Sequence, residues 1–141
     1  MEYLTLAEVE FVAHELARQM MDGDEPIPPF ASRYEDRLES CLSTPQQTYD
    51  KRELYPTLLD KVAILFYLMI KSHPFENGNK RVAVMTLIYI LYKNGKWLSL
   101  PGMVLYQFAK DVAASESRRK DDQVKSIRAF LKPHIVDYDK K

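Results

Sequence analysis

The sequence lacks the features that mark secreted, membrane-spanning or nucleic-acid-binding proteins. Its single cysteine, Cys41, cannot form an internal disulfide, and no basic segment followed by an apolar core opens the chain. Twenty Lys and Arg residues balance twenty Asp and Glu residues, so no excess positive charge favours nucleic acid. The longest apolar stretches, Val62–Ile70 and Val82–Tyr92, are shorter than the roughly 20 residues that cross a bilayer. These absences predict a cytoplasmic protein that does not enter membranes and is not a dedicated nucleic-acid binder.

The length and the apolar content fit one folding unit. A chain of 141 residues, 46% of them hydrophobic, can build one sizeable core. No segment repeats at a fixed period, and no linker of low complexity divides the chain. We therefore expect a single compact domain over residues 1–141.

Hydrophobic spacing and helix-end signals predict an all-α fold of about six helices. The expected helices are Thr5–Met21, Glu35–Leu42, Pro56–Ile70, Asn79 or Lys80 to Lys93, Met103–Ala114 and Asp121–Leu131. The expected connections are an irregular loop at Asp22–Pro29, a second one at Gln46–Tyr55 and a short extended piece at Trp97–Leu100. The third and fourth helices are apolar almost all round, which predicts that they lie in the centre with the Ser72–Gly78 loop between them.

That loop opens a stretch with an unusual set of polar residues, His73-Pro74-Phe75-Glu76-Asn77-Gly78-Asn79-Lys80-Arg81. A helix N-terminus offers free N–H groups and the positive end of the helix dipole. Gly78, Asn79 and Lys80 are therefore expected to form an anion site, with phosphate as the obvious ligand. Lys80 and Arg81 can neutralise charge on a phosphoryl group, and His73 can accept a proton from an attacking hydroxyl.

The nine residues resemble the signature of the Fic/Doc family, His-x-Phe-x-acid-Gly-Asn-Gly/Lys-Arg, at eight of nine positions. The resemblance covers about residues 3–100. It implies an ATP-dependent transferase in which Asn77, Gly78, Asn79, Lys80 and Arg81 bind the nucleotide phosphates. Asn77 stands where the family usually has the acid that binds Mg²⁺, so magnesium binding through Asn77 is expected to be weak.

The Asn-Lys-Arg form of the motif resembles the Doc (death-on-curing) branch. AMP-transferring Fic proteins usually have glycine in place of Lys80 and a further arginine in place of Val84. The Doc resemblance implies a toxin of a toxin–antitoxin pair that transfers the γ-phosphoryl group of ATP to Ser or Thr of a protein such as elongation factor Tu. It also implies a separate antitoxin, because the inhibitory spelling Ser/Thr-x-x-x-Glu-Gly/Asn occurs only at Ser72–Asn77, inside the loop itself.

Two other functions remain open at this point. The same loop could transfer AMP, or the chain could be a degenerate binding module that cannot hold magnesium because of Asn77. The Pro26–Phe30 loop is a further candidate, as a flap over the site. Phe75 is expected to anchor the loop in the core, His14 and His134 to be structural or exposed, and Cys41 to be a buried apolar residue.

Overall fold

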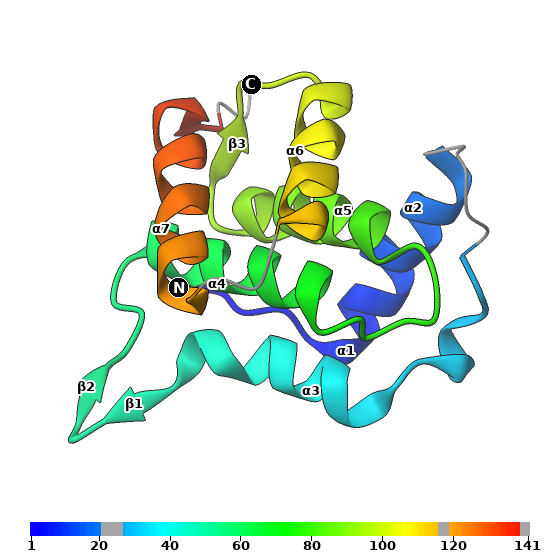
Figure 1. The fold of residues 1–141 in the computed structure, drawn as a ribbon, viewed down its shortest axis with the longest axis horizontal. Helices are drawn as coiled ribbons and strands as arrows, with labels where there is room; N and C mark the ends of the chain where they lie inside the picture. The colour runs from blue at the N-terminus through cyan, green and yellow to red at the C-terminus, as the bar shows by residue number, and fades with distance from the viewer. Residues whose placement is uncertain (21–26, 116–118, 139–141) are drawn as a thin grey trace.

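A computed structural model describes residues 1–20, 27–115 and 119–138, and within these ranges the chain is mostly helical (Figure 1). The helices are α1 (Leu6–Glu8), α2 (Glu15–Met20), α3 (Glu35–Ser43), α4 (Leu58–Lys71), α5 (Asn79–Lys93), α6 (Gly102–Ala114) and α7 (Lys120–Leu131). A π-helical segment, Val9–His14, joins α1 to α2, so that one continuous helical stretch runs from Leu6 to Met20. The predicted all-α class is confirmed, with two small antiparallel pairs of strands added to it. The predicted loop at Asp22–Pro29 lies mostly outside the described residues.

Capping side chains set where two of the helices begin. The Thr5 hydroxyl accepts a hydrogen bond from the Glu8 N–H (3.2 Å) and the Glu8 carboxylate accepts one from the Thr5 N–H (3.0 Å), as the sequence predicted. Thr57 and Asp60 form a second capping box at the start of α4. The prediction that Pro56 opens this helix was therefore wrong, because Thr57 is the cap and Pro56 precedes it.

Helices α4 and α5 form the centre of the molecule, as their apolar composition predicted. These two helices pack on each other. Helix α7 packs on α4, and α6 packs on both α4 and α5. Helix α3 also packs on α4, and the π-helical segment packs on α5. Figure 1 shows α3 on one side of this central pair and α6, α7 and β3 on the other. The core accordingly consists mainly of buried residues of α4 and α5 together with side chains from the surrounding helices.

The four short strands form two pairs. β1 (Thr48–Tyr49) and β2 (Arg52–Glu53) make a hairpin within the stretch predicted as a connection. β3 (Lys96–Leu98) pairs with β4 (Ile135–Asp137), with Trp97 opposite Val136, so the extended piece predicted near Trp97 is present. The second pair joins the segment after α7 to the segment after α5.

Candidate active site

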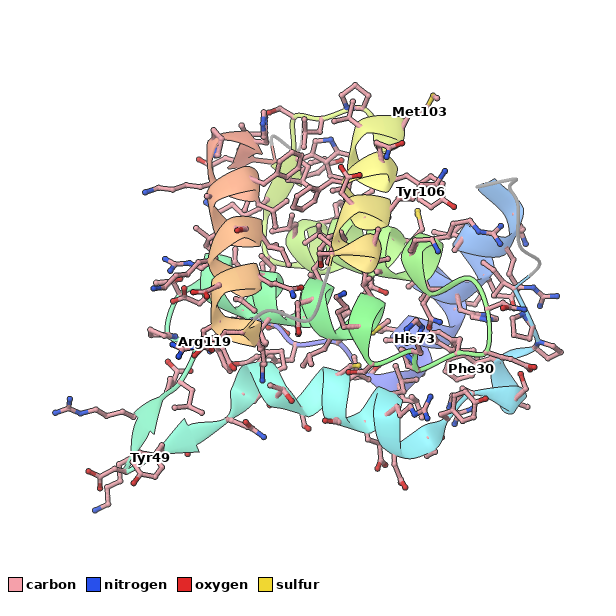
Figure 2. All side chains as sticks on the ribbon, in the orientation of Figure 1. Phe30, Tyr49, His73, Met103, Tyr106 and Arg119 are labelled. Atoms are coloured by element: carbon pink, nitrogen blue, oxygen red, sulfur yellow. The ribbon has the colours of Figure 1, made fainter. Side chains whose placement is uncertain are left out.

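The predicted site lies where α4 ends and α5 begins. Ser72 is the C-cap of α4, and the next residue, His73, has a φ of +49°, a left-handed conformation that a histidine seldom adopts. Figure 2 shows His73 and Phe30 toward the end of the molecule opposite the hairpin that carries Tyr49. The side chain of His73 is exposed, which leaves its ring open to a substrate.

Phe75 anchors this loop in the core. Its ring is 1% exposed and lies 5.3 Å from the His14 ring and 6.0 Å from the Phe30 ring, measured between centroids. The prediction that Phe75 is a structural anchor is confirmed. His14, on the π-helical segment, is fully buried and its Nε2 donates to the Pro28 carbonyl at 3.1 Å. Burial lowers the pKa of His14, so this ring is neutral and structural.

Asn79 closes the loop from the other side. Its Oδ1 accepts a hydrogen bond from the Phe75 N–H (2.9 Å), and its Nδ2 donates to the Phe75 carbonyl (2.8 Å). These two bonds fix which end of the amide faces His73, and Nδ2 lies 3.4 Å from His73 Nδ1. Asn79 is thus a clamp on the loop, 7% exposed.

Gly78 is the N-cap of α5, with φ +79° and ψ +13°. A Cβ at this position would lie 2.5 Å from Cγ1 of Ile27, so the buried Ile27 side chain packs directly over the glycine. The first hydrogen bond within the helix runs from the Val82 N–H to the Gly78 carbonyl. The N–H groups of the first helical turn, before Val82, have no carbonyl partner within the helix, and such N–H groups can bind an anion.

The charged residues of the motif differ in exposure. Glu76 and Asn77 are exposed, Lys80 is half-buried, and Arg81 is 5% exposed. All of them lie within the loop and the first turn of α5, so the predicted site residues share one end of the α4–α5 pair. Arg81 is more deeply placed than a solvated surface cation, which makes Lys80 the more accessible of the two positive charges.

Two backbone carbonyls of the loop are held by the start of α3. Tyr34 donates its N–H to the Pro74 carbonyl at 2.8 Å, and Arg37 donates from Nη1 to the His73 carbonyl at 3.3 Å. The Arg37 guanidinium carbon also lies 4.4 Å from the centroid of the Tyr34 ring. Neither residue was predicted as part of the site, because nothing in the local sequence around them signals a contact with a loop 36 residues away.

Comparison with protein families gives the decisive observation. The profile of the Fic/DOC family matches residues 3–91, which is more than half of the chain and includes the whole loop. The chain belongs to the Fic/DOC family. No curated protein and no solved structure gave a match. The family generally uses ATP and Mg²⁺.

The Fic/DOC loop offers few ligands to a metal ion. Among residues 1–20, 27–115 and 119–138, no three His, Cys, Asp or Glu side chains are grouped to hold one. Asn77 and Glu76, both exposed, supply one amide and one neighbouring carboxylate. Magnesium commonly takes one or two protein ligands and keeps water and phosphate oxygens for the rest. With an amide in place of the usual acid, the loop would hold magnesium only weakly, and the nucleotide would supply most of the ligands.

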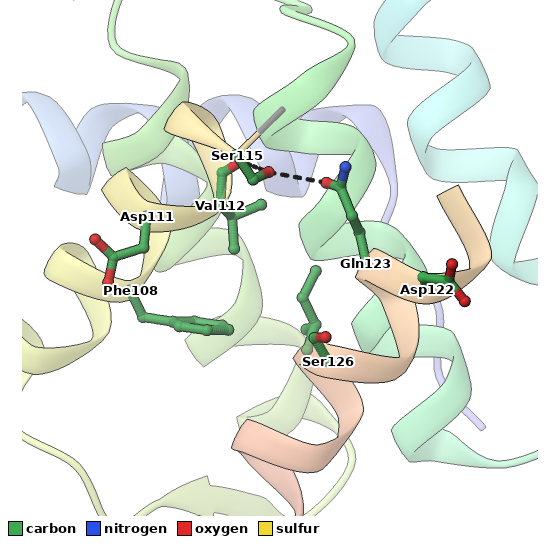
Figure 3. Close-up of a pocket in the computed structure, with 8 residues that line it drawn as sticks. Phe108, Asp111, Val112, Ser115, Asp122, Gln123 and Ser126 are labelled. Atoms are coloured by element: carbon green, nitrogen blue, oxygen red, sulfur yellow. Dashed lines mark hydrogen bonds between the residues drawn. The ribbon is translucent and has the colours of Figure 1, made fainter. Parts of the chain in front are cut away.

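A separate cleft of about 470 Å³ lies between α6 and α7 (Figure 3). It is lined by Phe108, Asp111, Val112, Ser115, Asp122, Gln123, Ser126 and Ile127. None of these residues belongs to the Fic/DOC motif, and two of them carry negative charge, which disfavours a triphosphate. The cleft is therefore a poorer candidate for binding a triphosphate than the loop. In the part of the chain that the structure describes, no helix has the length and apolarity needed to span a membrane.

Proposed function

We propose that this Fic/DOC protein is a Doc-like transferase that moves the γ-phosphoryl group of ATP to a Ser or Thr hydroxyl of another protein. The observation that carries the proposal is the arrangement of the loop. An exposed imidazole at the end of α4 lies beside the N-terminus of a 15-residue helix whose first turn holds Lys80 and Arg81. This combination brings a base and an anion site to one place.

In the proposed step the hydroxyl oxygen of the target attacks the γ-phosphorus. The bond from that phosphorus to the β–γ bridging oxygen breaks, ADP leaves, and His73 accepts the hydroxyl proton. Lys80 and Arg81, with the first-turn N–H groups of α5, offset the charge that gathers on the phosphate oxygens. Asn79 and Gly78 shape the cradle, and Asn77 is the nearest candidate for a protein ligand to magnesium, which reduces the charge repulsion between phosphates when bound.

Lys80 favours phosphoryl transfer over the alternative, AMP transfer, in which the α-phosphorus is attacked and pyrophosphate leaves. A half-buried cation two positions after Gly78, in the first turn of α5, can neutralise a transferred γ-phosphoryl group. The target protein, with elongation factor Tu as one candidate, and a separate antitoxin belong to the same proposal.

The test is incubation of the purified protein with bacterial lysate, Mg²⁺ and ATP labelled on either the α- or the γ-phosphate. Label from the γ position alone, lost in His73→Ala, is expected. His134→Ala is the matched control, because His134 is half-buried in the 3-10 turn that follows α7 and lies outside the loop. Label from the α position would establish AMP transfer, and no label from either would favour a binding module.

A further inference from the structure

His73 has an unfavourable backbone conformation that something must maintain. Its φ of +49° places a residue with a Cβ in the left-handed region. Such a conformation costs energy and persists only where neighbouring contacts hold it. A histidine that relaxed to negative φ would aim its ring in another direction, so the contacts that hold the backbone also decide where the ring points.

The contacts around His73 come from two directions. From α5, the Asn79 amide lies beside the ring and clamps the backbone of Phe75. From the start of α3, Arg37 and the Tyr34 N–H each bind one of two consecutive carbonyls, those of His73 and Pro74. The His73 carbonyl belongs to the peptide unit that follows the strained residue, so holding it resists rotation about the φ and ψ of His73, and the bond from Tyr34 fixes the next unit.

Arg37 is suited to this task by its own support. Its guanidinium lies 4.4 Å from the centre of the Tyr34 ring, at a distance that allows a cation–π contact. The planar guanidinium carries several N–H donors in a fixed geometry, so one of them can serve the His73 carbonyl while the plane rests on the ring. The ring thereby limits how far the exposed Arg37 side chain can move away from the loop.

We propose that Arg37, supported by Tyr34, is a positioning residue for His73. It acts on the backbone carbonyl of His73 and keeps the imidazole in the orientation that accepts the target's proton. The role in catalysis rests on the proposed function, whereas the effect on His73 itself does not depend on any activity.

The test compares Arg37→Gln with Arg52→Gln, which removes the same charge from the exposed hairpin strand β2 at the opposite end of the molecule. In the labelling assay, Arg37→Gln is expected to lower kcat about two- to tenfold, the range of one modest hydrogen bond, with KM for ATP unchanged. Arg52→Gln is expected to change neither value. A higher KM at constant kcat would overturn the proposal and make Arg37 a nucleotide-binding residue.

A second measurement needs no activity. The chain has three histidines, so their ring signals can be followed by NMR. Arg37→Gln is expected to shift the ring signals of His73 and leave those of buried His14 in place, which also shows that the fold is retained. Unchanged His73 signals would overturn the positioning role. If no variant and no wild-type protein transferred label but the His73 signals still shifted, the proposed function would fail and the positioning of His73 would stand.

Discussion

Replacing Gly78 by alanine tests how closely Ile27, in the segment before α3, packs on the loop between α4 and α5. Alanine at φ +79° costs about 1 to 2 kcal/mol in backbone conformation. The new methyl group would also lie 2.5 Å from Ile27 Cγ1, a separation at which one of the two must move. Overpacking of this kind costs about 1 to 3 kcal/mol. Gly78→Ala is therefore expected to lower the free energy of unfolding by about 2 to 5 kcal/mol.

Gly95 provides a matched control. It has nearly the same conformation, φ +75°, but no atom lies within 4 Å of the position that its Cβ would occupy. Gly95→Ala is expected to lose only the conformational part, about 1 to 2 kcal/mol. Urea unfolding followed by the fluorescence of Trp97, the single tryptophan, measures both variants.

The difference between the two glycine variants isolates the contact with Ile27. Adding Ile27→Ala to Gly78→Ala should recover part of that difference, with a coupling energy of about 1 to 3 kcal/mol in a double-mutant cycle. Equal losses for Gly78→Ala and Gly95→Ala, or strict additivity in the cycle, would show that Ile27 does not pack on the loop in solution.

Three other side chains give independent tests. Burial raises the pKa of Glu8, but hydrogen bonds led by that from Lys93 outweigh it and lower the pKa to about 2. The ionised form of Glu8 thus stabilises the fold above pH 4.5. At pH 7 the free energy of unfolding of the wild type should therefore exceed that of Glu8→Gln by about 2 kcal/mol. A difference that persisted as the pH fell toward 2 would refute this. Buried Lys61 donates hydrogen bonds to Glu53 and to two backbone carbonyls. Lys61→Met should therefore lower the free energy of unfolding by about 2 to 4 kcal/mol and speed amide hydrogen exchange in the β1–β2 hairpin. Unchanged exchange would contradict the anchoring of the hairpin by Lys61. Burial raises the pKa of Cys41 to about 12, so a thiol reagent at pH 8 should label it only in the unfolded chain, and rapid labelling of the native protein would disprove its burial.

Helix positions could be predicted because their signals are local. The capping box of Thr5 and Glu8 and the Asn94-Gly95 stop after α5 lie within a few residues of the ends that they determine. The hairpin at β1 and β2 gave no such signal. Its turn places Asp50 and Lys51 at positive φ without glycine, so the sequence lacked the usual mark of a tight turn, and buried Lys61 anchors the stretch from α4.

The candidate site was predictable for a similar reason, because its chemical groups are consecutive in sequence. His73 to Arg81 are brought together by one loop and one helix turn, so a pattern of nine consecutive residues was enough to propose them as candidates. The residues that hold the loop are distant in sequence. Ile27 and Arg37 contact it through tertiary packing, and no periodicity or cap in the sequence encodes such a contact.

The supports of the loop bear on how the proposed chemistry could work. Phe75 is fixed in the core, Asn79 clamps the backbone of Phe75, and Gly78 is covered by Ile27. These contacts lie within the protein itself, so they fix where His73 lies relative to the N-terminus of α5. Groups that are positioned in advance do not have to be reorganised during the reaction, and this lowers the barrier to transfer. The left-handed His73 is then a cost of holding its imidazole in place, and the packing around α4 and α5 offsets that cost.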